Sequence, residues 1–253
     1  MLVRGNQQAT TGWFVGILEG EGSFHKPKFG GVEVRVHNTN LDIIEGCESY
    51  LKKNNIFFTR QVQDRAGRKL QYTISIRNSK TIYRFVDRLY TLISPSMECR
   101  LDEFQRIIGA SETTCDPSII DYDWLTGIYE AEGSFSLCLN NRGVAALKIE
   151  ISNTNQRIIR KVQSHLATMQ CGYHLVDKVH KVGCSQAQMV EIYGMRRCQR
   201  FLESMRGRWV AERNVRRTEG MMRFIMSRLA RPRKAPYSAE ELSSIQSVRD
   251  LNA

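Results

Sequence analysis

The spacing of hydrophobic and polar residues predicts a helix and then a hairpin near the start of the chain. Apolar and small residues recur at helical spacing from Thr11 to about Gly20. Ser23–Lys28 and Val32–Asn38 favour two paired strands around the turn Phe29-Gly30-Gly31. Gly22 stands just beyond the helix, so we expect it to end the helix in a left-handed backbone conformation.

A second predicted helix and a second predicted hairpin follow along the chain. The pattern from Asn40 to Asn55 is amphipathic and predicts a second helix. Ile56–Gln63 and Leu70–Arg77 predict a second hairpin across a polar turn. Ser79–Leu92 and Met97–Ile108 predict further helices, which makes the order helix, two strands, helix, two strands, helices.

A second run of elements begins after a polar stretch that contains Pro117. Its predicted elements are a hairpin of Ser134–Leu139 and Ala145–Asn153, a helix at Thr154–Met169, a hairpin of Gly172–His180 and Gln188–Tyr193, and a helix at Met195–Met205. Beyond them, Ser238 and Glu241 form a capping box that predicts a short terminal helix, either docked on the body or loose.

The two runs of elements are copies of one unit. Trp13–Phe24 (WFVGILEGEGSF) matches Trp124–Phe135 (WLTGIYEAEGSF), and Asn38-Thr39-Asn40 matches Asn153-Thr154-Asn155. An internal repeat constrains the fold more than any single motif. We therefore expect a mixed α/β (α+β) protein. Its expected parts are an N-terminal extension at 1–11, a first repeat at 12–109, a linker at 110–121, a second repeat at 122–229 and a C-terminal tail at 230–253.

Composition adds information about the partner and the compartment. The chain has 253 residues, of which 42% are hydrophobic, and a formal net charge of +11 that both halves share. Such a charge favours a polyanionic partner, although a merely basic soluble protein is the alternative. An odd count of seven cysteines indicates reduced thiols inside a cell. Neither a membrane-spanning run nor a targeting segment is expected, and the sequence does not distinguish bacterial or phage cytoplasm from an organelle matrix.

Small residues mark one stripe on each of the two repeated helices. Gly16 and Gly20 share a face, as do Gly127 and Ala131, because four residues make about one helical turn. Small side chains allow two helix backbones to approach closely. If the repeats pack by pseudo-twofold symmetry, we expect the two helices to meet along these stripes.

Two carboxylates would then emerge side by side, Glu21 and Glu132. Like charges repel, and both would lie at the negative end of a helix dipole. A divalent cation resolves this conflict, and paired hard oxygen ligands suit Mg²⁺. The alternative is that both are ordinary helix-end acids. Glu19 and Glu130 point elsewhere around the helix, so we expect a structural or interface role for them.

These motifs resemble the LAGLIDADG homing endonuclease family in its single-chain, two-repeat form. The first copy keeps Gly16, Glu19, Glu21 and Gly22, and the second keeps Leu125, Gly127, Glu130, Glu132 and Gly133. The resemblance extends from Gly12 to about Arg228. It implies two pseudo-twofold-related αββαββα repeats in a monomer, with antiparallel sheets that form a DNA-binding saddle.

The resemblance also implies the site residues. Glu21 and Glu132 correspond to the catalytic acids that hold Mg²⁺, a site that Mn²⁺ or Ca²⁺ can also occupy, and Gly20 and Ala131 belong to the same metal site. Asn38 and Asn153 fall where the family places a polar amide near the attacking water, with helix capping as the alternative. Arg100 and Arg213 correspond to a basic catalytic residue, usually Lys, with ordinary surface charge as the alternative.

Strand alternation predicts which residues contact DNA. If the valine faces pack on helices, the opposite faces present hydrogen-bonding side chains to base edges, and flanking basic residues contact phosphates. The predicted contacts in the first repeat are Ser23, His25, Lys26, Lys28, Glu33, Arg35, His37, Thr59, Gln61, Gln63, Arg65, Arg68, Lys69, Gln71, Thr73, Ser75 and Arg77. Those in the second are Ser134, Ser136, Asn140, Arg142, Lys148, Glu150, Ser152, His174, Lys178, Lys181 and Glu191.

The resemblance thus implies an intron-encoded, site-specific endonuclease that hydrolyses both strands of a long asymmetric DNA target, with Mg²⁺ as cofactor and 3′ overhangs as products. Two alternatives stay open. One is a maturase that binds its own intron RNA, and the other is a sequence-specific DNA-binding protein that no longer cleaves.

Overall fold

The computed structural model describes residues 8–25, 33–64, 66–67, 69–77, 82, 120–178, 186–232 and 234–252. Apart from Ile82, the predicted helices at Ser79–Leu92 and Met97–Ile108 lie outside the described residues, as does most of the predicted linker. The chain divides into two compact units, Met1–Glu132 and Gly133–Ala253, and each is described by itself.

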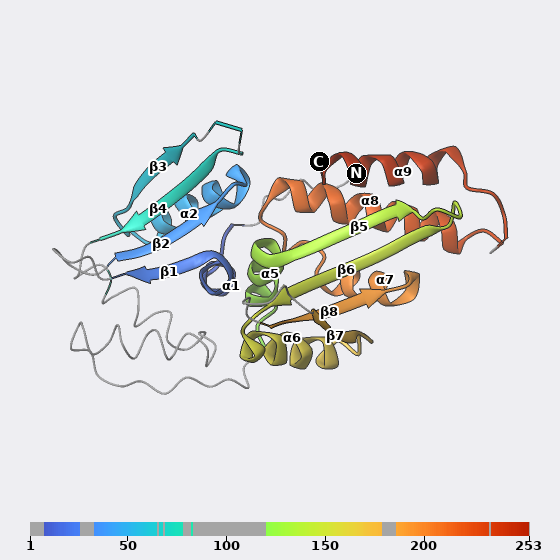
Figure 1. Ribbon diagram of the computed structural model, residues 1–253, viewed down its shortest axis with the longest axis horizontal. Coiled ribbons are helices and arrows are strands. Elements are labelled where there is room, and N and C mark those ends of the chain that lie inside the picture. The colour runs from blue at the N-terminus through green and yellow to red at the C-terminus, as the bar shows by residue number, and fades with distance from the viewer. Residues whose placement is uncertain are drawn as a thin grey trace. The chain divides into compact units, whose positions relative to one another are not determined.

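Unit 1 contains one four-stranded antiparallel sheet with strand order β1-β2-β4-β3. Helix α2 packs on one face of the sheet, against β2 and β4 (Figure 1). The described elements of the unit are α1 (Thr11–Glu21), β1 (Gly22–His25), β2 (Glu33–Asn38), α2 (Leu41–Lys53), β3 (Thr59–Gln63), β4 (Gln71–Ile76) and α5 (Tyr122–Glu132).

The core of unit 1 follows the predicted alternation. Val34 pairs with Ile76 and Val36 with Ile74 across β2 and β4, and all four side chains are buried. Because neighbouring residues of a strand point to opposite faces, the residues between them lie on the polar face. The apolar side of α2 covers the buried face of the sheet with Ile43, Ile44, Cys47 and Leu51.

Helices α1 and α5 pack in direct backbone contact within unit 1. A Cβ atom placed on Gly16 would collide with the carbonyl oxygen of Trp124, and one on Gly127 would collide with that of Trp13. A Cβ on Gly20 would lie 2.5 Å from the Cβ of Ala131. The stripes of small residues therefore bring the two helices together, as the sequence predicts.

The predicted left-handed conformation of Gly22 is wrong. Its backbone is extended, with φ −82° and ψ 154°, because the chain passes from α1 directly into β1. The position still excludes larger residues, since a Cβ there would collide with the carbonyl oxygen of Leu18. Glycine is required for close backbone approach, and a positive φ is not involved.

Unit 2 contains a second antiparallel sheet with the equivalent strand order β5-β6-β8-β7. Helices α6 and α7 both pack against β6 and β8 (Figure 1). The described elements of the unit are β5 (Gly133–Leu139), β6 (Ala145–Asn153), α6 (Gln156–Thr168), β7 (His174–Lys178), β8 (Ala187–Tyr193), α7 (Met195–Ser204), α8 (Glu212–Leu229) and α9 (Ala239–Asp250). The predicted mixed α/β class, with two antiparallel sheets and flanking helices, is confirmed.

The terminal helix α9 is docked, and its predicted capping box is present. The Ser238 hydroxyl accepts a hydrogen bond from the Glu241 amide, and the Glu241 carboxylate accepts one from the Ser238 amide. Two further bonds attach the tail to the β5–β6 hairpin. Asn252 donates to the carbonyl oxygen of Phe135 at 2.9 Å, and the Tyr237 hydroxyl accepts from the Ala145 amide at 2.7 Å. Among the described helices, none is long and apolar enough to cross a membrane.

Candidate active site and nucleic-acid interface

The two predicted catalytic acids are the last residues of the paired helices α1 and α5. Glu21 ends α1 and Glu132 ends α5. The close packing at Gly20 brings them near each other, because a Cβ on Gly20 would lie 3.0 Å from the Cγ of Glu132. The helix pairing thus places two half-buried carboxylates together at the negative ends of two helix dipoles.

This placement disfavours the charged forms of both acids. Burial, and after it the negative charge of Glu132, raises the pKa of Glu21 to about 7. Burial also raises the pKa of Glu132. A pair of carboxyls with raised pKa values gains most from a cation that replaces the bound proton.

Asn38 contacts one of these acids directly. Its Oδ1 accepts a hydrogen bond from the Asn40 amide at 2.7 Å, which fixes the orientation of the side-chain amide. Its Nδ2 then donates to Glu21 Oε1 at 3.3 Å. The turn before α2 and the contact with Glu21 are therefore made by the two ends of one amide group.

Asn153 makes the same turn in unit 2. Its Oδ1 accepts from the Asn155 amide at 2.8 Å, and Asn155 is itself the N-cap of α6. Asn38 and Asn153 are therefore not the N-caps of α2 and α6. Each forms an Asx turn with the residue two positions later, and that residue is the N-cap. The part that Asn153 would take in catalysis stays a prediction.

Glu19 and Glu130 have the structural role that their position on the helices predicts. Trp13 Nε1 donates to Glu130 Oε2 at 2.7 Å, and Trp124 Nε1 donates to Glu19 Oε2 at 2.7 Å. The two bonds are reciprocal, since each motif helix supplies one indole and one carboxylate at matched positions. They hold α1 and α5 in register.

The donor set fits a hard divalent cation. The described residues contain no group of three or more His, Cys, Asp and Glu side chains suited to a metal. Glu21 and Glu132 nevertheless supply two carboxylates, and the carbonyls of Gly20 and Ala131 lie one residue before them at the same helix ends. Mg²⁺ commonly takes one or two carboxylates and completes its octahedron with water and phosphate oxygens.

The two predicted basic catalytic residues have different outcomes. Arg100 lies outside the described residues. Arg213 lies in the first turn of α8, next to the buried Asn214, and its charge contributes, after burial, to lowering the pKa of Arg217 to about 10. The role of Arg213 stays a prediction.

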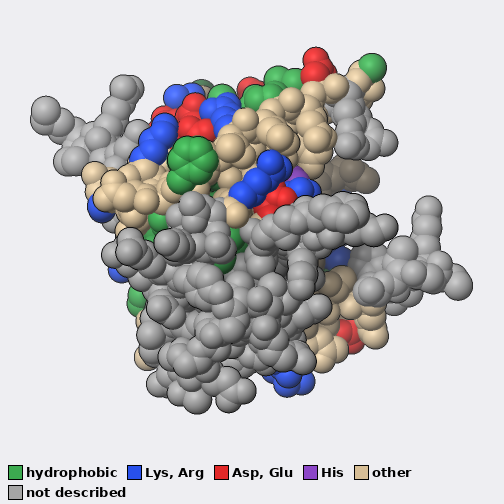
Figure 2. All heavy atoms as spheres, turned by 90° about the vertical axis from the view of Figure 1, so that its left-hand side faces the viewer, with side chains coloured by type: hydrophobic (Ala, Val, Ile, Leu, Met, Phe, Trp, Pro, Cys, Tyr) green, Lys and Arg blue, Asp and Glu red, His purple; other side chains and the backbone are tan. Residues whose placement is uncertain are grey.

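The strand register places the predicted contacts of unit 1 on one face. His37 lies opposite Thr73, which lies opposite Gln61, so that a polar row crosses three strands. Ser23, Arg35, Ser75 and Thr59 form the next row in the same way. On the side of the molecule seen in Figure 2, Lys and Arg side chains lie beside Asp and Glu side chains.

Three of these residues are less accessible than a base contact requires. Glu33, Thr73 and Ser75 are 2%, 4% and 2% exposed, so we leave them out of the proposed DNA surface. Arg35 and Arg77 both donate to Glu33, and the His37 ring hydrogen-bonds to the Thr73 hydroxyl. Lys26, Lys28, Arg65 and Arg68, together with the side chain of His25, lie outside the described residues.

Unit 2 has the equivalent polar face. Ser134 lies opposite Glu150, which lies opposite Glu191, which lies opposite His174. Arg142 is exposed in the β5–β6 turn, where the side chain of Asn140 accepts two backbone bonds and therefore serves the turn itself. Lys181 lies outside the described residues.

An exposed aromatic cluster that the strand pattern did not predict lies on this face. Tyr193 is 50% exposed, and its ring stacks on His174 with ring centroids 4.7 Å apart. Arg197 donates to His174 Nε2 at 2.8 Å and lies over the Tyr193 ring. Strand alternation places Tyr193 on the same face as Glu191, two residues earlier, so the sequence pattern could have predicted its position. Arg197 lies in α7, so no strand pattern could predict that it joins the cluster.

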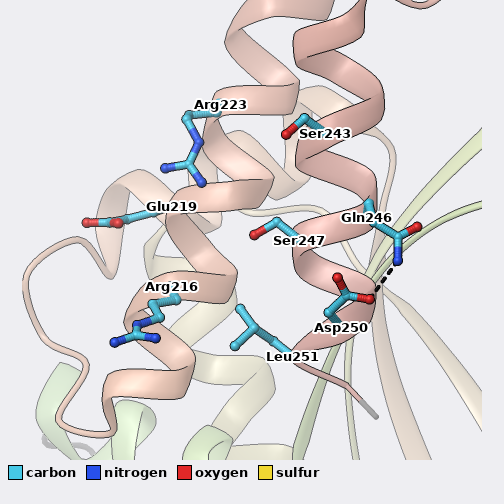
Figure 3. A pocket seen from close by; sticks show the side chains of 8 residues that line it. All are labelled: Arg216, Glu219, Arg223, Ser243, Gln246, Ser247, Asp250 and Leu251. Carbon is cyan, nitrogen blue, oxygen red and sulfur yellow. Dashed lines mark hydrogen bonds between the residues drawn. The ribbon is translucent and has the colours of Figure 1, made fainter.

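A hollow of about 600 Å³ lies between α8 and α9 (Figure 3). Arg216 and Arg223 line one side, and Asp250 and Ser247 lie on α9. Both signs of charge are present, Arg216 is paired with Glu212 at 3.0 Å, and Gln246 is bonded to Asp250 at 2.6 Å. Because the charges of the lining residues are of both signs, neither a cation nor an anion is favoured in the hollow.

Comparisons with known proteins found one matching family model and several solved structures of similar fold. A family model for the LAGLIDADG-like domain matches residues 9–90. The solved structure of a point mutant of I-SmaMI is similar, with a TM-score of 0.65 and 12% identity over 96% of this chain and 98% of that chain. The structure of the I-LtrWI LAGLIDADG homing endonuclease bound to target DNA has a TM-score of 0.64 and 14% identity, over 95% of this chain and 96% of that chain. The structure of the LAGLIDADG meganuclease I-AabMI bound to uncleaved DNA has a TM-score of 0.63 and 12% identity, over 95% of this chain and 98% of that chain. No curated protein matches the sequence.

Proposed function

We propose that this protein, which carries a LAGLIDADG-like domain and has the fold of the LAGLIDADG homing endonucleases, is a site-specific double-strand DNA endonuclease. The observation that carries the proposal is the pairing of Glu21 and Glu132 at the ends of α1 and α5. The proposal is supported by the division of roles between the acids, since Glu19 and Glu130 bond to the tryptophans of the opposite helices, and Glu21 and Glu132 take no part in those bonds.

The proposed cofactor is Mg²⁺, held by Glu21 and Glu132 with backbone carbonyls of Gly20 and Ala131 nearby. Bound there, Mg²⁺ would neutralise charge on the phosphate and lower the pKa of a bound water. Asn38 keeps the Glu21 carboxylate oriented and can hydrogen-bond a water beside it. We further propose that Asn153, Arg100 and Arg213 act as the family resemblance implies, with the two guanidiniums neutralising phosphate charge.

The proposed substrate is a long asymmetric duplex, cut in both strands to leave 3′ overhangs. The polar sheet faces supply hydrogen-bonding side chains, and the net charge of +11 supplies attraction to phosphates. The two faces carry different residues in the same strand register, which suits a target whose halves differ in sequence. We propose that the chain acts as a monomer, since it contains both sheets. No described feature favours intron RNA over DNA, so a maturase role stays a prediction.

The experiment is a cleavage selection from randomised DNA duplexes in Mg²⁺, followed by assays on the recovered target. Glu21→Gln and Glu132→Gln should each reduce double-strand cleavage by at least about 100-fold, because each removes a charged ligand. Binding of the target, measured in Ca²⁺, should persist in both variants. Glu45→Gln on the exposed side of α2 is the matched control and should cut normally.

Two results would overturn the proposal. One is full cleavage by both site variants. The other is failure of the wild-type protein to enrich any duplex, by cleavage or by binding. Raising salt from roughly 50 to 200 mM should weaken binding by orders of magnitude, and a flat salt response would contradict the DNA-binding faces.

A further inference from the structure

The polar faces of the two sheets carry clusters of opposite charge at matched positions. Asn38 and Asn153 end equivalent strands, so counting back along β2 and β6 matches Arg35 with Glu150 and Glu33 with Lys148. The neighbouring strands keep the match, because Arg35 lies opposite Ser75 and Glu150 lies opposite Glu191. Along β2 an acidic residue is followed by a basic one, and along β6 the matched positions carry a basic residue followed by an acidic one.

In unit 1 the cluster consists of Glu33, Arg35 and Arg77. Glu33 Oε2 accepts from Arg35 Nη2 at 2.5 Å, and its Oε1 accepts from Arg77 Nε at 2.8 Å. Burial of Glu33 is outweighed by these bonds, which lower the pKa of its carboxyl to about 2. The buried carboxylate therefore fixes two guanidiniums, of which Arg77 is the more exposed, and the cluster carries a net charge of about +1.

In unit 2 the cluster consists of Lys148, Glu150 and Glu191. Lys148 Nζ lies 2.5 Å from Glu150 Oε2 and 3.3 Å from Glu191 Oε1. The hydrogen bond with Glu150, outweighing burial, raises the pKa of Lys148, so that its ammonium stays charged. One cation therefore fixes two carboxylates, and this cluster carries a net charge of about −1.

A net negative cluster on a face that meets DNA repels phosphates, in a chain that is otherwise strongly basic. The repulsion is offset where the carboxylates accept hydrogen bonds from base amino groups. In the major groove, cytosine N4 is the donor that Glu typically reads, whereas guanine presents the O6 and N7 acceptors that Arg reads. The two clusters have the complementary chemistries for these two bases.

We propose, on the basis of the DNA-binding function proposed above, that the two clusters are base-specificity determinants of opposite sense. Glu150 and Glu191, positioned by Lys148, select cytosine in one half of the target. Arg35 and Arg77, positioned by Glu33, select guanine in the other half. The inverted charge then makes the two half-sites distinguishable at equivalent positions, which fixes the orientation of the protein on its target.

The test is selection by binding from a randomised duplex pool in Ca²⁺, so that the readout does not require cleavage. The triple variant Lys148→Glu/Glu150→Arg/Glu191→Ser gives unit 2 the residues that unit 1 carries at Glu33, Arg35 and Ser75. We expect one selected position to change from cytosine to guanine, with the base ratio there shifting by at least about tenfold. The other selected positions should not change.

Milder variants keep the test independent of folding of the triple variant. Glu191→Gln should weaken cytosine preference at that position about tenfold. Arg77→Gln should weaken guanine preference at a different position, while Arg216→Gln on α8 should change neither. Unchanged base preferences in both Glu191→Gln and Arg77→Gln would overturn the inference while leaving the endonuclease proposal intact. Failure of the wild-type protein to select any duplex would instead overturn the proposed function.

Discussion

The paired helices and the sheet faces have diverged to different extents between the repeats. On α1 and α5, Trp13 corresponds to Trp124, Glu19 to Glu130 and Glu21 to Glu132, so the polar groups that matter are matched one for one. On the sheet faces the strand order and register are equivalent, yet Glu33 corresponds to Lys148 and Arg35 to Glu150.

The difference follows from what each surface contacts. Each motif helix packs against the other, with glycines touching backbone atoms and each tryptophan bonded to the opposite helix. A change on one helix therefore has to be accommodated by its partner. The outward side chains of the sheet faces bond to neighbours on the same face, as Glu33 does to Arg35 and Lys148 to Glu191, so such a cluster can change as a set. Close packing keeps the two repeats alike at the helix ends that carry Glu21 and Glu132, whereas the polar sheet faces carry different charge clusters in the same strand register.

The largest effect on stability is expected from breaking the helix contact. Gly127→Ala places a Cβ against the carbonyl oxygen of Trp13 and the Cα of Gly16. Because backbone atoms cannot move aside locally, we expect a loss of about 2–3 kcal/mol in the free energy of unfolding, measured by urea denaturation. Gly172→Ala is the control, since the three atoms nearest to a Cβ there all belong to the side chain of Arg197, at 3.0 Å or more, and the change should cost much less. Equal costs for the two changes would contradict the close contact.

A smaller effect is expected from the reciprocal indole bonds, and the two should not be equal. Trp13→Phe removes the donor to Glu130, which is 5% exposed, whereas Trp124→Phe removes the donor to the less buried Glu19. Loss of a bond to a buried carboxylate costs about 1–3 kcal/mol, so Trp13→Phe should be the more destabilising change. Thermal unfolding of the two variants checks this order, and the reverse order would contradict it.

The smallest expected effect is a pH dependence of the melting temperature that arises from Glu21 at the end of α1. The pKa of Glu21 is raised to about 7, so the folded state binds a proton more tightly than the unfolded state does. The stabilisation is therefore complete below the unfolded pKa near 4.5 and is lost as the pH rises through about 7. Without metal, the melting temperature should fall over this interval, and Glu21→Gln should flatten the profile. A wild-type profile as flat as that of the variant would contradict the raised pKa.

Much of this architecture could be predicted because hydrophobic periodicity reports directly on burial. The alternation of Val34 and Val36 with Arg35 correctly separated the two faces of β2, and the repeat brought Glu21 and Glu132 to equivalent helix ends. The small-residue stripes likewise predicted which helix faces would meet. Each of these depends on neighbours along the chain or on the duplication itself.

Other features depend on contacts that are distant in sequence. The bond from Trp13 to Glu130 spans 117 positions, and the pairing of Lys148 with Glu191 requires the order in which strands join the sheet. The left-handed conformation predicted for Gly22 is wrong because a glycine after a helix commonly ends it in that conformation, whereas here the steric requirement comes from Leu18 and the chain continues directly into a strand. Arg197 joins the aromatic cluster from a different element.

We propose that Glu21 and Glu132 bind one divalent cation jointly. The most direct test is titration of Mn²⁺ into the complex with the selected DNA target, followed by electron paramagnetic resonance of free Mn²⁺, for the wild-type protein, Glu21→Gln and Glu132→Gln. Each substitution alone should weaken Mn²⁺ binding by at least about tenfold, because each removes one charged ligand of a shared site. Wild-type affinity in either variant would contradict a site built from both repeats.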